Sequence, residues 1–96
     1  MFVVISYDVN TLTKEGRSRL RKVAKVCEGV GQRSQYSVFE CQMTETQLER
    51  FRQRADKVVV PEEDNLRIYH IRGSREECVE IYGRDGYVDY EDVLLA

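Results

Sequence analysis

An apolar run opens the chain and ends at a carboxylate. In the segment MFVVISYD the residues are mostly β-branched or aromatic as far as Tyr7. A run this short is typical of a buried strand and not of a helix. Asp8 follows where the strand leaves the core, just before the turn-prone Asn10. The pattern predicts a central strand over residues 1–8 with a carboxylate at its mouth.

Two stretches repeat apolar residues at helical spacing. The first predicts a helix over residues 13–28, whose apolar stripe consists of Gly16, Leu20, Val23, Ala24 and Cys27. The second predicts a helix that begins after Thr44 and ends near Lys57, because Thr44 and Gln47 match the capping-box pattern. Its inward positions are Leu48, Phe51 and Ala55.

The remaining apolar segments have strand patterns. GQRSQYSVFECQ predicts two short strands joined near residues 35–37, the second over 37–41, and NLRIYHIR predicts a strand over 65–72. Two more candidates, CVEIYG and DVLLA, flank a turn at residues 84–86. The order β-α-β-β-α-β predicts an α+β, ferredoxin-like fold with an antiparallel sheet and both helices on one face. We therefore expect one domain over residues 1–96, with a core of about 1–73 and a strand-rich tail of about 76–96.

In a monomer the second face of this sheet would be exposed to solvent, and it should then carry polar residues. The predicted strands at residues 2–5 and 66–71 instead have apolar residues on both faces. With no third helix in the pattern, a second copy of the chain is the simplest cover, so we expect a homodimer. The C-terminal strand DVLLA has no place in this sheet and is expected to pair with the partner subunit.

Composition and charge narrow the function classes. Hydrophobic residues make up 42% and charged residues 33% of the chain, as in soluble globular proteins. The net charge of −2 excludes a uniformly basic nucleic-acid binder, so any polyanion site must be a local cluster. The three cysteines lack CxxC spacing, as expected for reduced thiols in a cytosolic protein. The apolar opening lacks a basic n-region, and no apolar stretch reaches membrane-spanning length, so we expect a cytoplasmic protein without a membrane partner.

Asp8 is the first candidate for chemistry. A single carboxylate is a poor metal site, but a two-fold dimer that stacks through the sheet would bring Asp8 from each subunit together. Mg²⁺ is commonly held by one or two carboxylates plus waters. The alternative is that Asp8 caps the loop into the first helix, a role in which Asp is common.

Basic and aromatic residues are the second candidates. Five basic residues stand in the first turns of the first helix: Lys14, Arg17, Arg19, Arg21 and Lys22. Helix N-termini favour anions and Arg binds phosphate through a bidentate fork, although a solvated helix face has the same composition. Arg33 stands near Tyr36 and Phe39, a combination that suits base stacking, while Phe39 in a strand is equally typical of a core. His70, the one histidine, is interpreted as a strand residue and not as a base.

Three segments together resemble the CRISPR-associated endoribonuclease family of the Cas-two type, a family of spacer-acquisition proteins. They are Tyr7-Asp8 at the end of the first strand, GRSRL at residues 16–20 and QRSQYSVFE at residues 32–40. The segment DNLRIY at residues 64–69 fits the usual fourth strand of that family. The similarity covers nearly the whole chain.

This resemblance implies a ferredoxin-like homodimer with Mg²⁺ or Mn²⁺ held by a catalytic Asp8 at the interface. It implies cleavage of single-stranded RNA or duplex DNA, and spacer acquisition with a CRISPR integrase partner. Residues that match the family's nucleic-acid contacts are Tyr7, Arg17, Arg19, Arg33 and Phe39. Two alternatives stay open: a non-catalytic dimeric scaffold that bridges integrase subunits, and a VapD-like RNA-cleaving toxin. No residue is an obvious general base.

Overall fold

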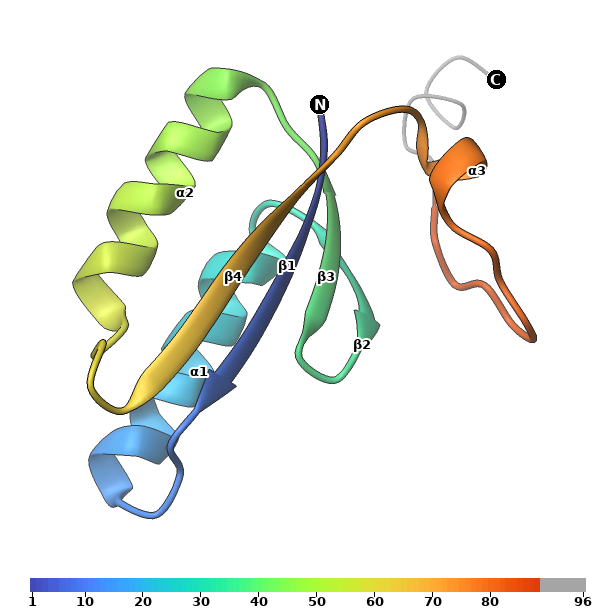
Figure 1. The fold of residues 1–96 in the computed structure, drawn as a ribbon. Helices are drawn as coiled ribbons and strands as arrows, with labels where there is room; N and C mark the ends of the chain where they lie inside the picture. The colour runs from blue at the N-terminus through green and yellow to red at the C-terminus, as the bar shows by residue number, and fades with distance from the viewer. Residues whose placement is uncertain (89–96) are drawn as a thin grey trace.

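The computed structural model describes residues 1–88 (Figure 1). Its strands are β1 (Phe2–Val9), β2 (Gln32–Gln35), β3 (Val38–Gln42) and β4 (Asp64–Ile71), and its helices are α1 (Lys14–Glu28), α2 (Glu45–Val58) and α3 (Arg75–Cys78). The strands form one antiparallel sheet in the order β2-β3-β1-β4. α1 and α2 pack against one face of this sheet; in Figure 1, α1 passes behind β1 and β4, and α2 lies to the left of β4. The predicted α+β, ferredoxin-like arrangement is confirmed.

The core lies between the sheet and these two helices. Alternate residues of a strand point to opposite faces, and in β1 the helix-covered face receives Val3, Ile5, Tyr7 and Val9, all buried. Phe39 and Phe51 are among the largest fully buried side chains. The capping box of α2 is present, since the Thr44 hydroxyl accepts from the Gln47 N–H at 3.2 Å and the Gln47 side chain accepts from the Thr44 N–H at 2.9 Å.

The opposite face, called here the open sheet face, is the one that α1 and α2 leave uncovered. Val4 stands beside Tyr69 and Phe2 beside Ile71 in the β1–β4 register, which places four apolar residues on this face. Ser6, beside Arg67, is polar. The predicted apolar character is therefore confirmed only for part of this face.

The tail differs from the prediction. Residues 78–83 form no strand: the chain makes the short helix α3 and then continues without regular structure as far as Val88. Ser74 caps α3, because its hydroxyl accepts from the Glu77 N–H at 3.2 Å. This local helix start outweighs the strand propensity of the residues that follow, and the expectation that no third helix exists was wrong. The second predicted tail strand, residues 92–96, lies outside the described residues.

Candidate metal and nucleic-acid site

Asp8 lies on the open sheet face near the end of β1, beside Asn65 of β4. Its side chain is exposed, and no residue in the described part of the chain forms a hydrogen bond or ion pair with it. Residues 1–88 contain no group of three Asp, Glu, His or Cys side chains that could hold a metal. One chain therefore offers a single free carboxylate here, and a second carboxylate for a metal at Asp8 would have to come from another molecule.

The loop between β1 and α1 does not use Asp8 as a cap. Asn10 and Thr13 are the capping residues. The Asn10 side chain accepts from the Leu12 N–H at 3.0 Å, and the Thr13 hydroxyl accepts from the Gly16 N–H at 3.0 Å. The loop lies so close to the helix that a Cβ on Gly16 would overlap the Asn10 carbonyl. The alternative role of Asp8 as a loop cap is wrong, which leaves its carboxylate available.

Arg19 anchors this corner of the fold. Its guanidinium Nε donates to Asp64 Oδ2 at 2.8 Å, and the Asp64 side chain is 0% exposed. The same carboxylate accepts from the N–H groups of Asn10 at 3.2 Å and Val60 at 3.0 Å. These bonds, led by the one from Arg19, hold the pKa of Asp64 below its ordinary value. Arg19 thus joins α1 to the start of β4 and to the residues that follow Asp8, and its guanidinium is already engaged by carboxylates.

Arg17 is arranged differently. Its side chain is exposed and donates to the Thr11 carbonyl at 3.2 Å, and in residues 1–88 it has no carboxylate partner. Of the two arginines predicted to contact nucleic acid in the first helix, Arg17 is the one whose charge is not neutralised by a neighbouring acid.

Tyr7, Phe39 and Arg33 do meet, but on the helix-covered side of the sheet. The Tyr7 and Phe39 rings stack with centroids 6.2 Å apart, and Arg33 Cζ lies 5.1 Å from the Phe39 centroid. Burial raises the pKa of the Tyr7 hydroxyl, and the Arg33 guanidinium opposes that rise. Phe39 is 0% exposed, which corrects the expectation that a base could stack on it. The exposed ring beside Arg33 is that of Tyr36, 84% exposed and 5.8 Å from Arg33 Cζ.

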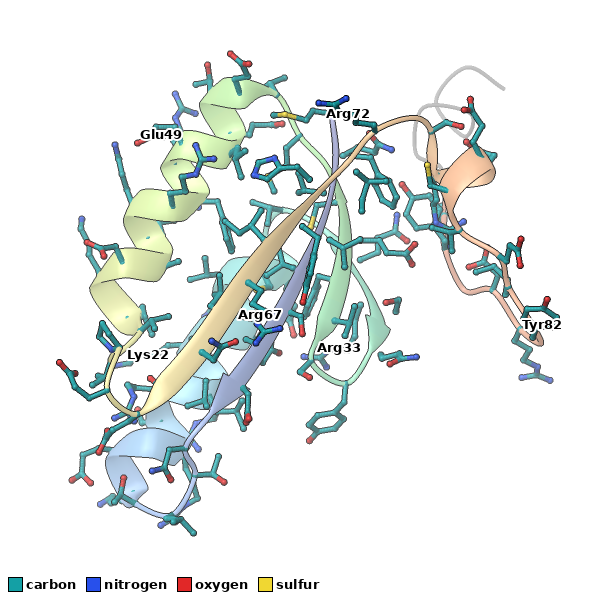
Figure 2. The ribbon with its side chains drawn as sticks, in the orientation of Figure 1. Lys22, Arg33, Glu49, Arg67, Arg72 and Tyr82 are labelled. Carbon is teal, nitrogen blue, oxygen red and sulfur yellow. The ribbon has the colours of Figure 1, made fainter. Side chains whose placement is uncertain are left out.

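The predicted site residues therefore fall into separate places. Tyr7 and Asp8 are neighbours in sequence but point to opposite faces of the sheet, with Tyr7 buried and Asp8 exposed. Figure 2 shows Arg67 projecting from the sheet on the side away from the helices, the side that also carries Asp8. The structure does not bring Asp8 together with Arg33 or Phe39 within one chain.

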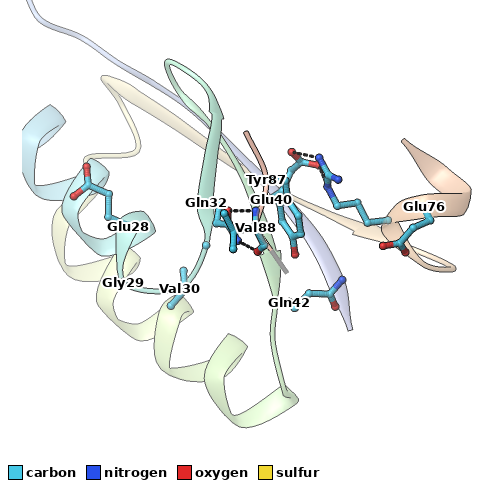
Figure 3. A pocket seen from close by; sticks show the side chains of 11 residues that line it. Glu28, Gly29, Val30, Gln32, Glu40, Gln42, Glu76, Tyr87 and Val88 are labelled. Carbon is cyan, nitrogen blue, oxygen red and sulfur yellow. Dashed lines mark hydrogen bonds and ion pairs between the residues drawn. The ribbon is translucent and has the colours of Figure 1, made fainter. Parts of the chain in front are cut away.

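Sequence reasoning missed a polar cluster around Arg75. Its guanidinium bonds to Glu40 of β3 at 2.9 Å and to Asp85 at 2.8 Å, and it lies 3.9 Å from the centroid of the Tyr87 ring. A cavity of about 580 Å³ lies beside this cluster, between the tail and β2–β3 (Figure 3). The one available signal was a charged Glu40 between two apolar strand residues, which indicates a carboxylate with a buried partner.

Gln32 of β2 holds the end of the described tail. Its side-chain amide donates to the Val88 carbonyl and accepts from the Val88 N–H, as the dashed lines in Figure 3 show. Together with the Arg75–Glu40 bond, this contact attaches the tail at two points to the β2–β3 side of the open sheet face. The tail thus occupies part of that side of the face.

Comparisons with known proteins agree on one family. The family model described as CRISPR associated protein Cas2 matches residues 1–78. The chain is 41% identical over 95 residues to the CRISPR-associated endoribonuclease Cas2 1 of Moorella thermoacetica, covering 99% of each chain. It is 43% identical over 95 residues to the CRISPR-associated endonuclease Cas2 of Halalkalibacterium halodurans, again covering 99% of each.

Two solved structures have a similar fold. The crystal structure of Streptococcus pyogenes Cas2 at pH 6.5 superposes with a TM-score of 0.76 at 41% identity, covering 86% of this chain and 100% of that one. A hypothetical protein from Thermus thermophilus superposes with a TM-score of 0.70 at 34% identity, covering 86% of this chain and 90% of that one.

Proposed function

The chain belongs to the Cas2 family of CRISPR-associated proteins, and we propose that it is a metal-dependent endonuclease that hydrolyses phosphodiester bonds of RNA or DNA. The names of its relatives, endoribonuclease and endonuclease, support this activity. The observation that carries the proposal is the free, exposed carboxylate of Asp8 on the open sheet face.

The proposed active form is a homodimer stacked through the open sheet face. The apolar residues Val4, Tyr69 and Ile71 support this interface, and a two-fold axis near β1 would place Asp8 of both subunits together. Two carboxylates with waters fit the oxygen ligands that Mg²⁺ or Mn²⁺ prefers. When bound, such a metal polarises a phosphoryl oxygen and lowers the pKa of a coordinated water.

The chain's own residues then have distinct roles. Asp8 holds the metal, and Arg17, which lies in the first turn of α1 close to the same end of β1, neutralises phosphate charge. Arg19 is a positioning residue, because its bond to Asp64 fixes the loop that follows Asp8. The biological role proposed for this enzyme is spacer acquisition with an integrase partner, which family membership supports.

A non-catalytic scaffold is the second candidate. The observation that favours it is the lone carboxylate: residues 1–88 provide no acidic, His or Cys cluster from which a base could come. The scaffold would use the same dimer and the same arginines without turnover.

One experiment separates the two functions. Cleavage of single-stranded RNA and of duplex DNA is measured with Mg²⁺, with Mn²⁺ and with EDTA, for the wild type and for Asp8→Asn. We expect metal-dependent cleavage by the wild type that is lost in Asp8→Asn, while Asp56→Asn, an exposed carboxylate on α2, stays active. Metal-dependent cleavage that survives in Asp8→Asn would refute Asp8 as the metal ligand. If none of the three proteins cleaves, the non-catalytic scaffold is the function that remains.

The dimer has its own test. Sedimentation of the full chain should give a dimer at micromolar concentration, and a chain cut after Tyr90 should dissociate more readily if residues 92–96 pair with the partner. If both run as monomers, Asp8 has no second carboxylate and the metal site fails with the dimer.

A further inference from the structure

The charges of this protein are divided between its layers. α1 and α2 together contain ten of the 15 basic residues but only five of the 17 acidic ones. The two helices therefore carry a net charge of +5 by this count, and the rest of the chain carries −7, which together give the overall −2. An acidic protein thus has a strongly basic layer on the side of the sheet away from Asp8.

Most of these helical cations have no acidic partner. Arg19 pairs with Asp64 and Glu63, and Arg52 pairs with Glu49 at 3.4 Å. The other helical basic residues form no ion pair in the part of the chain that the structure describes. They are Lys14, Arg17, Arg21, Lys22, Lys25, Arg50, Arg54 and Lys57. Charges left uncompensated on one layer favour an anionic partner there.

Four of these cations gather along the seam between the two helices. Val26 of α1 and Val58 of α2 line one small apolar hollow between the two helices and Leu66 of β4, so each of the two lies toward the other helix. Lys22 is one turn before Val26, and Arg54 is one turn before Val58, so each stands on the flank that faces the other helix. In the view of Figure 2, Lys22 projects toward the C-terminal end of α2.

Two more cations complete the row on α2. Arg50 precedes Arg54 by four residues and Lys57 follows it by three, spacings that place all three side chains on one flank of the helix. The acids of α2 stand on its other flank: Glu45, Glu49 and Asp56. The set Lys22, Arg50, Arg54 and Lys57, called here the seam cluster, is entirely exposed.

We propose that the seam cluster binds the phosphate backbone of a nucleic-acid duplex, as a surface separate from the one that carries Asp8. The proposal rests on the proposed function for the class of ligand, a nucleic acid, and adds a second place where the chain holds it. A row of cations on two packed helices matches a row of phosphates, and contacts of this kind carry no base specificity.

A membrane fits this surface less well. Helices that bind a bilayer surface place Trp, Phe or Leu beside their basic residues. The exposed large apolar residues of the described chain all lie outside α1 and α2. No helix within residues 1–88 has the length and apolar character needed to cross a membrane. The cluster is therefore a polar, basic surface, as expected for phosphate contacts.

The test compares two double variants that remove the same charge. Arg50→Gln with Arg54→Gln changes the seam cluster, and Arg72→Gln with Arg84→Gln is the matched control, since these arginines are also exposed and form no ion pair within residues 1–88. Binding of the full chain to a labelled duplex of arbitrary sequence is followed by fluorescence anisotropy between about 50 and 200 mM NaCl. Thermal unfolding checks that every variant is folded.

We expect the seam variant to lose about tenfold in affinity and to lower the slope of log affinity against log salt by about 2, because each phosphate contact contributes about 0.9. The control should lose less than about threefold, the effect of charge at a distance. Equal losses in the two variants, or none in either, would overturn the proposal. Binding to vesicles containing anionic lipid in place of the duplex would overturn it as well.

Asp8→Asn distinguishes this proposal from the proposed nuclease. Asp8 lies on the other face of the sheet, so its replacement is scored by cleavage, whereas the seam variant is scored by binding. If the wild type does not cleave but the seam variant still loses binding, the nuclease fails and the seam surface stands. If Asp8→Asn abolishes cleavage while the seam variant binds normally, the seam surface fails and the nuclease stands.

Discussion

Arg75 Nε and Glu40 Oε1 lie 2.9 Å apart, although 35 residues separate them in the chain. Their side chains are only 10% and 9% exposed, so this is a buried ion pair. Asp85 and the Tyr87 ring complete the surroundings of the same guanidinium. The pair is therefore the main polar link between the tail and the sheet.

Replacing Arg75 should destabilise the protein strongly. Arg75→Met removes the cation but keeps much of the volume, and it leaves the Glu40 carboxylate buried without its partner. We expect the free energy of unfolding to fall by about 3 kcal/mol, measured by urea denaturation. Arg84→Met, an exposed arginine in the same segment, should change it by less than about 0.5 kcal/mol. Similar small effects for both would mean that the tail contributes little to stability.

Asp64 should make stability depend on pH in the acid range. Its pKa in the folded protein is lowered, chiefly by the bond from Arg19, and the unfolded value is about 3.9. A lowered folded pKa adds stability above pH of about 3.9 and loses it as the pH falls toward the folded value. Asp64→Asn should lower the free energy of unfolding by about 2 kcal/mol at neutral pH. The difference in stability between this variant and the wild type should shrink as the pH falls below about 3.9. A difference that stays constant down to acid pH in thermal unfolding would contradict this role.

Arg17 and Arg19 should separate binding from stability. Arg17→Ala removes an exposed cation, so it should weaken nucleic-acid binding to all sequences alike and leave the melting temperature unchanged. Arg19→Ala leaves the buried Asp64 carboxylate without its cation, so it should lower the free energy of unfolding by about 2 kcal/mol. Anisotropy and thermal unfolding of both variants provide the measurement. If the Arg19→Ala protein is as stable as the wild type but binds nucleic acid more weakly, Arg19 contacts phosphate directly and the positioning role is wrong.

The three cysteines should differ in reactivity. Burial raises the pKa of Cys27 and of Cys41 to about 12, so neither thiol ionises near neutral pH. Cys78 is exposed. Because the thiolate is the reactive form, an aromatic disulfide reagent should modify one thiol per chain in the native protein and all three in denaturant. Rapid reaction of more than one native thiol would show that the core opens readily.

The sequence predicted those elements whose signals are local. The α2 boundaries follow from the Thr44–Gln47 capping box and the spacing of its apolar residues, and both are properties of neighbouring residues. The apolar run of β1 likewise has no good alternative to a buried strand. The alternation along β1 also places Tyr7 and Asp8 on opposite faces of the sheet, although both were predicted to be site residues.

What could not be predicted depends on contacts between distant residues. Nothing near Arg19 in sequence shows that Asp64 neutralises it, and nothing near Phe39 shows that Tyr7 and Arg33 cover its ring. The residues after Ser74 have strand propensity, but a strand needs an edge to pair with, and the helix start at Ser74 directs the chain elsewhere. These outcomes are set by packing, which overrides propensity.

Because of their position, residues 75–88 compete with any binding partner for the open sheet face of the same molecule. Within residues 1–88 the tail contacts the β2–β3 side of the open sheet face at Glu40 and Gln32, whereas Asp8 and Tyr69 on the β1–β4 side are exposed. A partner that needed the whole face would first have to displace the tail and break the ion pairs of Arg75. Its apparent affinity would then be reduced by the fraction of molecules in which the tail is displaced, whereas a partner confined to β1 and β4 would bind without that penalty.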